Sequence, residues 1–212
     1  MACVAMALLM LGVFQKSGAD EEVRTARLIS YLSVTTLGLV LLLVLTVSGE
    51  RLVAFDGMFV VDPFVAFFKV LALIASAIAI IISRQYMELQ DIARFEFPVL
   101  IVLATLGMMM MISANDLIAL YLGLELQSLS LYVVAAFQKD DARSSEAGLK
   151  YFVLGALASG MLLYGCSLVY GFAGTTGFDA LAERLHGSAD PSIGLIIGMV
   201  FILAGLAFKV SA

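Results

Sequence analysis

Long apolar runs separated by short polar stretches dominate this chain. They lie at residues 1–15, 28–48, 63–83, 97–114, 117–137, 149–171 and 191–212. None alternates apolar and polar positions with the period of two expected for a barrel strand. Each run after the first is long enough to cross a bilayer as a helix, which takes about 20 residues. The pattern therefore predicts an all-α polytopic membrane protein with about seven transmembrane helices.

The two ends of the chain depart from this pattern. Only the fourteen residues MACVAMALLMLGVF precede Gln15, and they lack the basic segment and the small-residue cleavage site of a signal peptide. We therefore expect the first run to be a transmembrane helix whose beginning is missing. The last run stops in FKVSA with no polar segment after Lys209. We expect the chain to be truncated there too.

Proline, aspartate and asparagine mark the starts of several predicted helices. Asp62 precedes the third span, and Asn115 and Asp116 precede the fifth, where their side chains are expected to act as N-caps. Three prolines fall in the first turn of a span, where a missing N–H costs nothing: Pro63, Pro98 and Pro191. The fourth and fifth spans are joined by so short a turn that they must be antiparallel neighbours.

The loops that connect the predicted spans fall alternately on the two sides of the membrane, and the two sets of loops differ in their number of lysines and arginines. One set carries seven lysines and arginines, at residues 15–27, 84–96 and 138–148. The other carries only Arg51 and Arg184, at residues 49–62, 115–116 and 172–190. Because basic loops stay in the cytoplasm, the first set is predicted to be cytoplasmic and the N-terminus to lie outside.

Composition excludes a water-soluble domain and a cofactor-binding one. The chain is 62% hydrophobic and 14% charged, whereas a soluble domain has about a quarter of its residues charged. The net charge of −5 is spread over short loops, which argues against a nucleic-acid partner. Cys3 and Cys166 lie in apolar segments without metal or iron–sulfur spacing. His186 is a lone loop histidine, so a metal site is not expected.

One carboxylate stands near the middle of the fifth span. Placing the charge of Glu125 there costs about 2.5–3.5 kcal/mol on insertion scales, so a polar group is expected to face it. Tyr121, Ser128 and Tyr132 lie at i−4, i+3 and i+7, on the same face of a helix as Glu125. This stripe suits a surface that lines a hydrated cavity or another helix. A buried, hydrogen-bonded carboxylate that only fixes helix packing is the alternative.

Three lysines also fall inside predicted spans. Lys209 follows eighteen residues without a charge and is either a buried functional group or a lysine that snorkels to the cytoplasmic interface. Lys150 opens the sixth span four residues after Glu146, so an interfacial ion pair also explains it. Lys69 lies about two turns inside the third span, where snorkelling suffices.

Small residues at i,i+4 spacing predict close helix packing rather than chemistry. The pairs are Gly155 with Ser159, Ala156 with Gly160, and Gly194 with Gly198. The glycine-rich segment GFAGTTG at 171–177 is interpreted as a turn. From the residues alone, the buried carboxylate and lysines suit a proton relay and equally suit an ion-coupled transporter.

Three stretches resemble a known family. They are NDLIALYLGLELQSLSLYVVAAF, EAGLKYFVLGALASGMLLYGCSLVYG and the ending LAGLAFKVSA. They are similar to the antiporter-like membrane subunits of respiratory complex I, in particular the subunit N family of bacterial NADH-quinone oxidoreductase. The resemblance is strong over residues 97–176 and 200–212. Over the first three spans it rests on their arrangement and on segments such as VDPFVAFFKVL.

The resemblance implies a fold and a set of functional residues. Residues 1–95 would form a three-helix membrane segment, and residues 96–212 an incomplete first repeat of an antiporter-like inverted-repeat fold. Glu125 matches the family's fifth-helix glutamate, Lys150 a sixth-helix lysine and Lys209 the lysine of a broken seventh helix. In the family, the glutamate and the seventh-helix lysine form a charge pair thought to gate proton movement.

The resemblance also implies a setting. The chain would be a multi-pass proton-translocating subunit in the bacterial inner membrane, with other membrane subunits and the lipid bilayer as partners and the quinone pool reached through the complex. It would carry no cofactor, while NADH, FMN, iron–sulfur clusters and quinone would bind elsewhere in the complex. The family's second inverted unit does not follow here, so this piece alone is not expected to transport protons.

Two other functions remain open at this point. One is a subunit of a multi-subunit sodium/proton antiporter, which shares the buried Glu–Lys chemistry. The other is a non-catalytic membrane scaffold whose buried charges only fix helix packing.

Overall fold

The computed structural model describes residues 1–14, 19–47, 51–187 and 192–210. Its elements are α1 (Ala2–Val13), α2 (Ala19–Val47), β1 (Leu52–Ala54), β2 (Phe59–Val61), α3 (Pro63–Leu89), α4 (Glu96–Ser113), α5 (Leu117–Ala135), α6 (Ala142–Ala173), α7 (Phe178–Gly187) and α8 (Ile193–Lys209). Five helices, α2 to α6, are long and apolar enough to cross a membrane, whereas α1 and α8 are shorter apolar helices. The predicted all-α membrane architecture is confirmed, with five of the seven predicted spans at full length.

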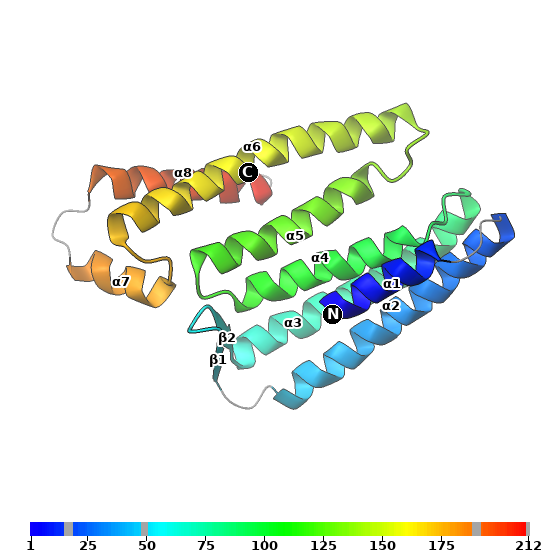
Figure 1. The fold of residues 1–212 in the computed structure, drawn as a ribbon, viewed down its shortest axis with the longest axis horizontal. Coiled ribbons are helices and arrows are strands. Elements are labelled where there is room, and N and C mark those ends of the chain that lie inside the picture. The colour runs from blue at the N-terminus through cyan, green and yellow to red at the C-terminus, as the bar shows by residue number, and fades with distance from the viewer. Residues whose placement is uncertain (15–18, 48–50, 188–191, 211–212) are drawn as a thin grey trace.

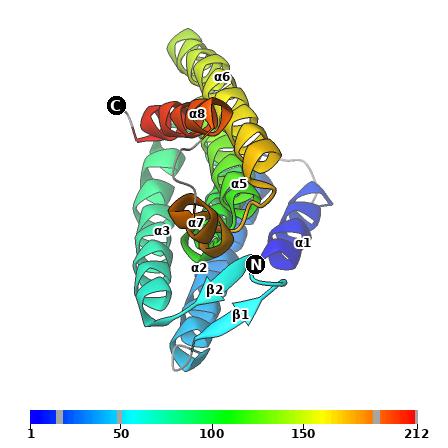
Figure 2. The ribbon, with the colours of Figure 1, turned by 90° about the vertical axis from the view of Figure 1, so that its left-hand side faces the viewer.

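The helices lie side by side with their connections at two opposite ends (Figure 1). The α3–α4 and α5–α6 connections lie at one end, which we call the basic end because it carries loops of the predicted basic set. The β1–β2 hairpin, the α4–α5 turn and α7 lie at the other, the hairpin end. Figure 2 looks onto the hairpin end and shows the hairpin and α7 in front of the bundle. The grouping of these connections agrees with the alternation read from loop charge.

Aspartate side chains start α3 and α5 as predicted. Asp62 accepts a hydrogen bond from the backbone N–H of Val65 at 2.7 Å, and Pro63 occupies the first turn of α3. Asp116 accepts from the backbone N–H groups of Ile118 and Ala119 at 2.8 and 3.2 Å. These bonds satisfy donors that the first turn of a helix leaves unpaired. Pro98 lies in the first turn of α4, and Pro191 lies outside the described residues.

Asn115 is not the cap of α5 but a link between loops at the hairpin end. Its Nδ2 donates to Gly57 O at 3.2 Å and to Asp179 Oδ2 at 3.1 Å. Its backbone N–H donates to Met58 O at 2.8 Å. The α4–α5 turn is therefore fixed to both the hairpin and α7.

Two connections at the hairpin end hold structure that the apolar pattern did not predict. Residues 52–61 form the antiparallel hairpin, in which Leu52 pairs with Val61 and Ala54 with Phe59. In the segment 172–190, α6 ends at Ala173, Gly174 adopts a left-handed conformation with φ of 69°, and α7 follows. The turn at 171–177 is thus confirmed at Gly174. The short strands and α7 escaped prediction because they contain too few apolar residues to form a run.

Three helices extend further than the apolar runs at the basic end. The α2 helix begins at Ala19, α3 continues to Leu89, and α6 begins at Ala142, seven residues before the predicted start at 149. Lys150 therefore lies in the third turn of α6 and does not open the helix. Hydropathy marks where a helix enters an apolar layer and misses the polar turns that continue it.

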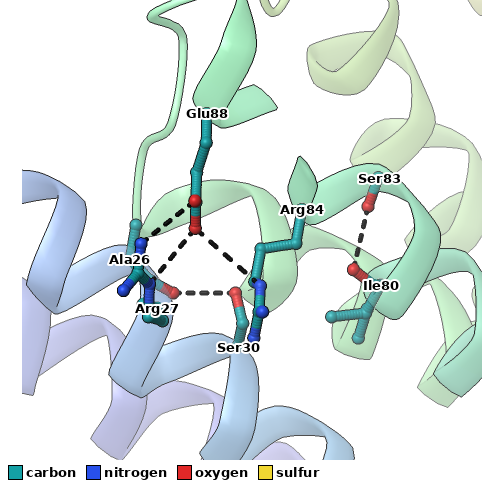
Figure 3. A network of polar contacts seen from close by, with 7 residues as sticks. All are labelled: Ala26, Arg27, Ser30, Ile80, Ser83, Arg84 and Glu88. Atoms are coloured by element: carbon teal, nitrogen blue, oxygen red, sulfur yellow. Dashed lines mark hydrogen bonds and ion pairs between the residues drawn. The ribbon is translucent and has the colours of Figure 1, made fainter. Parts of the chain in front are cut away.

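The basic end is held partly by an ion-pair network between α2 and α3 (Figure 3). Arg27 Nη2 lies 3.0 Å from Glu88 Oε2, and Arg84 Nε lies 3.8 Å from the other oxygen of the same carboxylate. The Arg84 guanidinium also lies 4.9 Å from the centre of the Tyr31 ring. Such half-exposed pairs contribute at most about 1 kcal/mol each, so they fix geometry more than stability.

Two hydrophobic clusters form the interior. The first joins α1, α2, α3 and α4 around Ile29, Leu73 and Val99, and the second joins α5, α6, α7 and α8 around Leu124 and Leu162. The α4 helix connects the two halves because it packs closely on α5 as well.

The contact between α4 and α5 depends on two glycines. A Cβ on Gly107 would lie 2.6 Å from Gln127 N and 2.6 Å from Gly123 O, and a Cβ on Gly123 would lie 2.8 Å from Met111 N. These neighbours are backbone atoms, which cannot rotate away. Glycine is therefore required at both positions for the two helices to approach this closely.

Candidate functional site

Glu125 lies in the middle of α5, on the side that faces α6. Its side chain is 19% exposed, and its Oε1 accepts a hydrogen bond from the Ser159 hydroxyl of α6. Ser159 itself is buried. The carboxylate that stood out in the sequence therefore points into a helix contact and has a polar partner there.

Lys209 approaches the same carboxylate from the end of α8. Its Nζ lies 3.5 Å from Glu125 Oε1, 2.9 Å from Ser128 Oγ and 3.0 Å from Tyr132 Oη. An ammonium group has three N–H donors, so these three acceptors match its full capacity. The side chain is 11% exposed. The structure thus brings four of the predicted site residues together: Glu125, Ser128, Tyr132 and Lys209.

The packing of α8 on α6 explains how Lys209 reaches this depth. A Cβ on Gly198 would lie 3.1 Å from Gly165 O, and a Cβ on Gly205 would lie 2.9 Å from Ala158 O. These small residues let α8 lie directly against α6, and α8 ends near the middle of α6 (Figure 1). Lys209 is therefore placed inside the bundle rather than at the basic end, where a snorkelling lysine would lie.

Tyr132 is held in position by α6. A Cβ on Gly155 would lie 2.0 Å from the Tyr132 hydroxyl, so glycine there leaves the room that the phenol occupies. The Tyr151 and Phe152 rings pack edge-on against the Tyr132 ring, with centroids at 4.6 and 5.8 Å. Sequence reasoning assigned Gly155 to helix packing, and its contact is in fact with a residue of the site.

Ser159 is the member of this cluster that sequence reasoning missed. It was interpreted as the small partner of Gly155 in a packing pair, although its hydroxyl bonds Glu125. The available signal was its position one helical turn after Gly155, on the face that packs against α5. A serine on such a face can serve both packing and hydrogen bonding.

Three other predicted residues are not among the hydrogen-bond partners of Lys209. Tyr121 packs with the second hydrophobic cluster. Lys150 pairs with Glu146 at 2.5 Å, and its side chain is 70% exposed. Lys69 is half-buried in α3. The structure thus shows the interfacial pair that the sequence offered as one explanation of Lys150.

The described part of the chain shows no metal centre. Among residues 1–14, 19–47, 51–187 and 192–210, no three His, Cys, Asp or Glu side chains gather in one place. The carboxylate, ammonium and hydroxyl groups of the site are chemically able to exchange protons.

Replacing Tyr132 with phenylalanine tests how far its hydroxyl positions Lys209. The variant keeps the ring contacts and removes one acceptor from a buried ammonium, and a hydrogen bond to a charged group contributes about 1.5–3 kcal/mol. We expect the protein to fold and its free energy of unfolding to fall by about that amount, as measured by thermal unfolding. Tyr151→Phe is the matched control and should leave the free energy of unfolding unchanged. Equal losses in both variants would show that the effect does not come from the hydroxyl contact with Lys209.

Residues 114–212 match the family described as NADH:quinone oxidoreductase/Mrp antiporter, TM. The fold is similar to a chain of respiratory complex I from Thermus thermophilus, with a TM-score of 0.77 and 30% identity, over 98% of this chain and 42% of that one. It is also similar to a chain of the Mrp complex from Dietzia, with a TM-score of 0.70 and 24% identity, over 97% of this chain and 39% of that one. The match to this family and the shared fold therefore define an antiporter-like membrane subunit.

Comparison with curated proteins narrows this class. The chain is 59% identical to NADH-quinone oxidoreductase subunit N of Paramagnetospirillum magneticum, over all of this chain and 43% of that protein. It is 58% identical to subunit N 1 of Rhizobium meliloti, over all of this chain and 42% of that protein. The chain belongs to the NADH-quinone oxidoreductase subunit N family. It spans less than half the length of these relatives.

Proposed function

We propose that this chain contributes the Lys209–Glu125 part of a proton relay in the membrane domain of a proton-translocating NADH-quinone oxidoreductase. The observation that carries the proposal is the buried ion pair between α8 and α5, whose ammonium is matched by three acceptors. Ionisable groups inside a membrane bundle are expensive and usually mark ion or proton pathways.

The geometry suits a pair that can be made and broken. Glu125 Oε1 accepts from both Lys209 and Ser159, so the carboxylate keeps one donor when the lysine leaves. Lys209 likewise keeps Ser128 and Tyr132 when the carboxylate takes up a proton. Each partner therefore has polar contacts in both states, which lowers the cost of separating the charges. Lys150, on the exposed side of α6, is proposed as a further group of the relay.

Redox chemistry is assigned to other subunits. NADH, FMN, iron–sulfur clusters and quinone would be bound there, and the membrane subunits would couple quinone reduction to the shift of charge in this chain. The basic end is proposed to face the cytoplasm and the N-terminus the outside of the bacterial inner membrane, because the basic loops gather at one end.

Ion specificity of the complete complex tests this function. In proteoliposomes with NADH and quinone, we expect proton translocation that persists in sodium-free medium. The measurement is vesicle pH recorded together with NADH oxidation. Proton exchange that requires sodium and is unchanged when NADH is added would instead assign the chain to a sodium/proton antiporter.

A further inference from the structure

A small pocket lined by several charged side chains lies between α2, α3 and the start of α4, at the basic end of the bundle. Its volume is about 20 Å³, which is room for about one water molecule. Its charged lining residues are Arg27, Arg84, Glu88 and Arg94. Three guanidinium groups therefore line the pocket with one carboxylate.

The ion pairs around this pocket leave one positive charge unbalanced. Glu88 pairs with both Arg27 and Arg84 (Figure 3), and Arg94 pairs with Glu22. These five side chains together carry a net charge of +1. Arg84 approaches Glu88 only to 3.8 Å and donates no hydrogen bond within the part of the chain that the structure describes. Its N–H donors are therefore available to a further acceptor.

The donors that the pocket offers to a ligand belong to its arginines. The two serines of the lining use their hydroxyl protons within their own helices, Ser30 on Ala26 O at 2.7 Å and Ser83 on Ile80 O at 3.1 Å. The planar fork of a guanidinium group matches the oxygens of a phosphate. Because the pocket has room for only one water molecule, a phosphate would lie at its mouth, with one oxygen in the place of that water.

Apolar side chains are exposed beside these arginines. The Arg84 guanidinium lies 4.9 Å from the centre of the Tyr31 ring, and Tyr31 is 56% exposed. Ile81, one turn deeper along α3 than Arg84, is 60% exposed. Tyrosine is typical of the membrane–water interface, and an exposed isoleucine deeper along the same helix suits contact with lipid chains. A phosphate site with apolar surface directly below it fits a phospholipid better than a free phosphate ion.

We propose that Arg27, Arg84 and Arg94 form a binding site for the phosphate of an anionic phospholipid in the leaflet that meets the basic end. The acyl chains of this lipid lie along Tyr31 and Ile81. The unbalanced positive charge selects an anionic headgroup over a zwitterionic one, and basic pockets between transmembrane helices are known to bind anionic headgroups. The site goes beyond the proposed proton relay and does not depend on it.

Photochemical labelling of the complete complex tests this site without any readout of activity. The complex is placed in phosphatidylcholine liposomes that contain a phosphatidylglycerol or a phosphatidylcholine with a photoreactive acyl chain, and labelled peptides are identified by mass spectrometry. We expect the phosphatidylglycerol probe to label α2 and α3 more strongly. Arg84→Gln should lower this labelling roughly fivefold, the effect of one basic residue near an anionic lipid. Arg143→Gln, exposed at the start of α6 at the same end, is the matched control and should not change it.

Two further variants distinguish a lipid site from a network that only holds α2 to α3. Glu88→Gln removes the carboxylate that competes with the lipid phosphate, so labelling should rise severalfold, and Arg84→Lys, which keeps the charge, should retain most of it. If Glu88→Gln instead lowers labelling as Arg84→Gln does, the network has only a structural role. Equal labelling by both probes would also refute the proposal. So would an attachment of α2 and α3 to an acidic loop of another subunit in place of lipid.

Discussion

A complete complex that carries Glu125→Gln is expected to lose nearly all proton translocation by this subunit. The amide cannot take up the proton that Lys209 releases, and it leaves the ammonium without its counter-charge. Breaking a buried pair by removing one partner costs about 3–5 kcal/mol because the other charge stays uncompensated. The measurement is the number of protons pumped per electron in proteoliposomes, compared with Glu183→Gln in the exposed face of α7.

A double variant distinguishes a proton-transferring pair from a pair that only fixes helix packing. In Glu125→Gln with Lys209→Met, the unpaired charge is gone, so the complex should assemble better than with Glu125→Gln alone. Transport should remain lost, because neither proton-carrying group is present. If the double variant recovers both assembly and pumping, the pair only fixes helix packing and the scaffold interpretation is correct.

Gly107→Val is expected to prevent assembly by forcing α4 and α5 apart. The added side chain would begin 2.6 Å from backbone atoms of α5, whereas a real contact needs well over 3 Å. Overpacking a close-packed site typically costs about 1–3 kcal/mol, and fixed backbone neighbours place this site at or above the upper end. Blue-native electrophoresis and thermal unfolding of the complex would report the loss.

Gly160→Val, in the middle of α6, is the matched control. A Cβ at Gly160 meets no atom within 4 Å among the described residues, so the same substitution fits without displacement. We expect normal assembly and a small gain from better helix propensity. Equal damage from both substitutions would show that a contact with another subunit decides the outcome, not the α4–α5 approach.

The predicted polar face on α5 shows which part of the site can be predicted from residue spacing along one helix. Residues at i+3 and i+7 from Glu125 share its face by the geometry of any α-helix, so spacing along the chain is enough to group Ser128 and Tyr132 with it. The same rule grouped Tyr121, which packs with the second hydrophobic cluster. Periodicity defines a face but not which part of that face another helix covers.

Partners from other helices lay beyond such reasoning. Ser159 bonds Glu125 across 34 positions and Lys209 pairs with it across 84, and helical periodicity relates only residues within a few turns. The family resemblance supplied Lys209 as a partner, whereas nothing in the sequence supplied Ser159. A pair within one helix is different. The i,i+4 pair of Lys150 with Glu146 could be predicted from sequence spacing, and the structure contains it.

The sequence by itself determined the membrane class, the spans α2 to α6, the caps of α3 and α5 and the alternation of basic loops. Each follows from local physics: burial of apolar runs, capping of unpaired N–H groups and the electrostatics of loops. Only the tertiary structure decided that α8 ends beside α5, that Lys209 contacts Tyr132 as well as Glu125, and that Gly107 lets α4 and α5 approach closely. Those features depend on how helices pack against one another, and packing is a property of surfaces that meet in space rather than of neighbours along the chain.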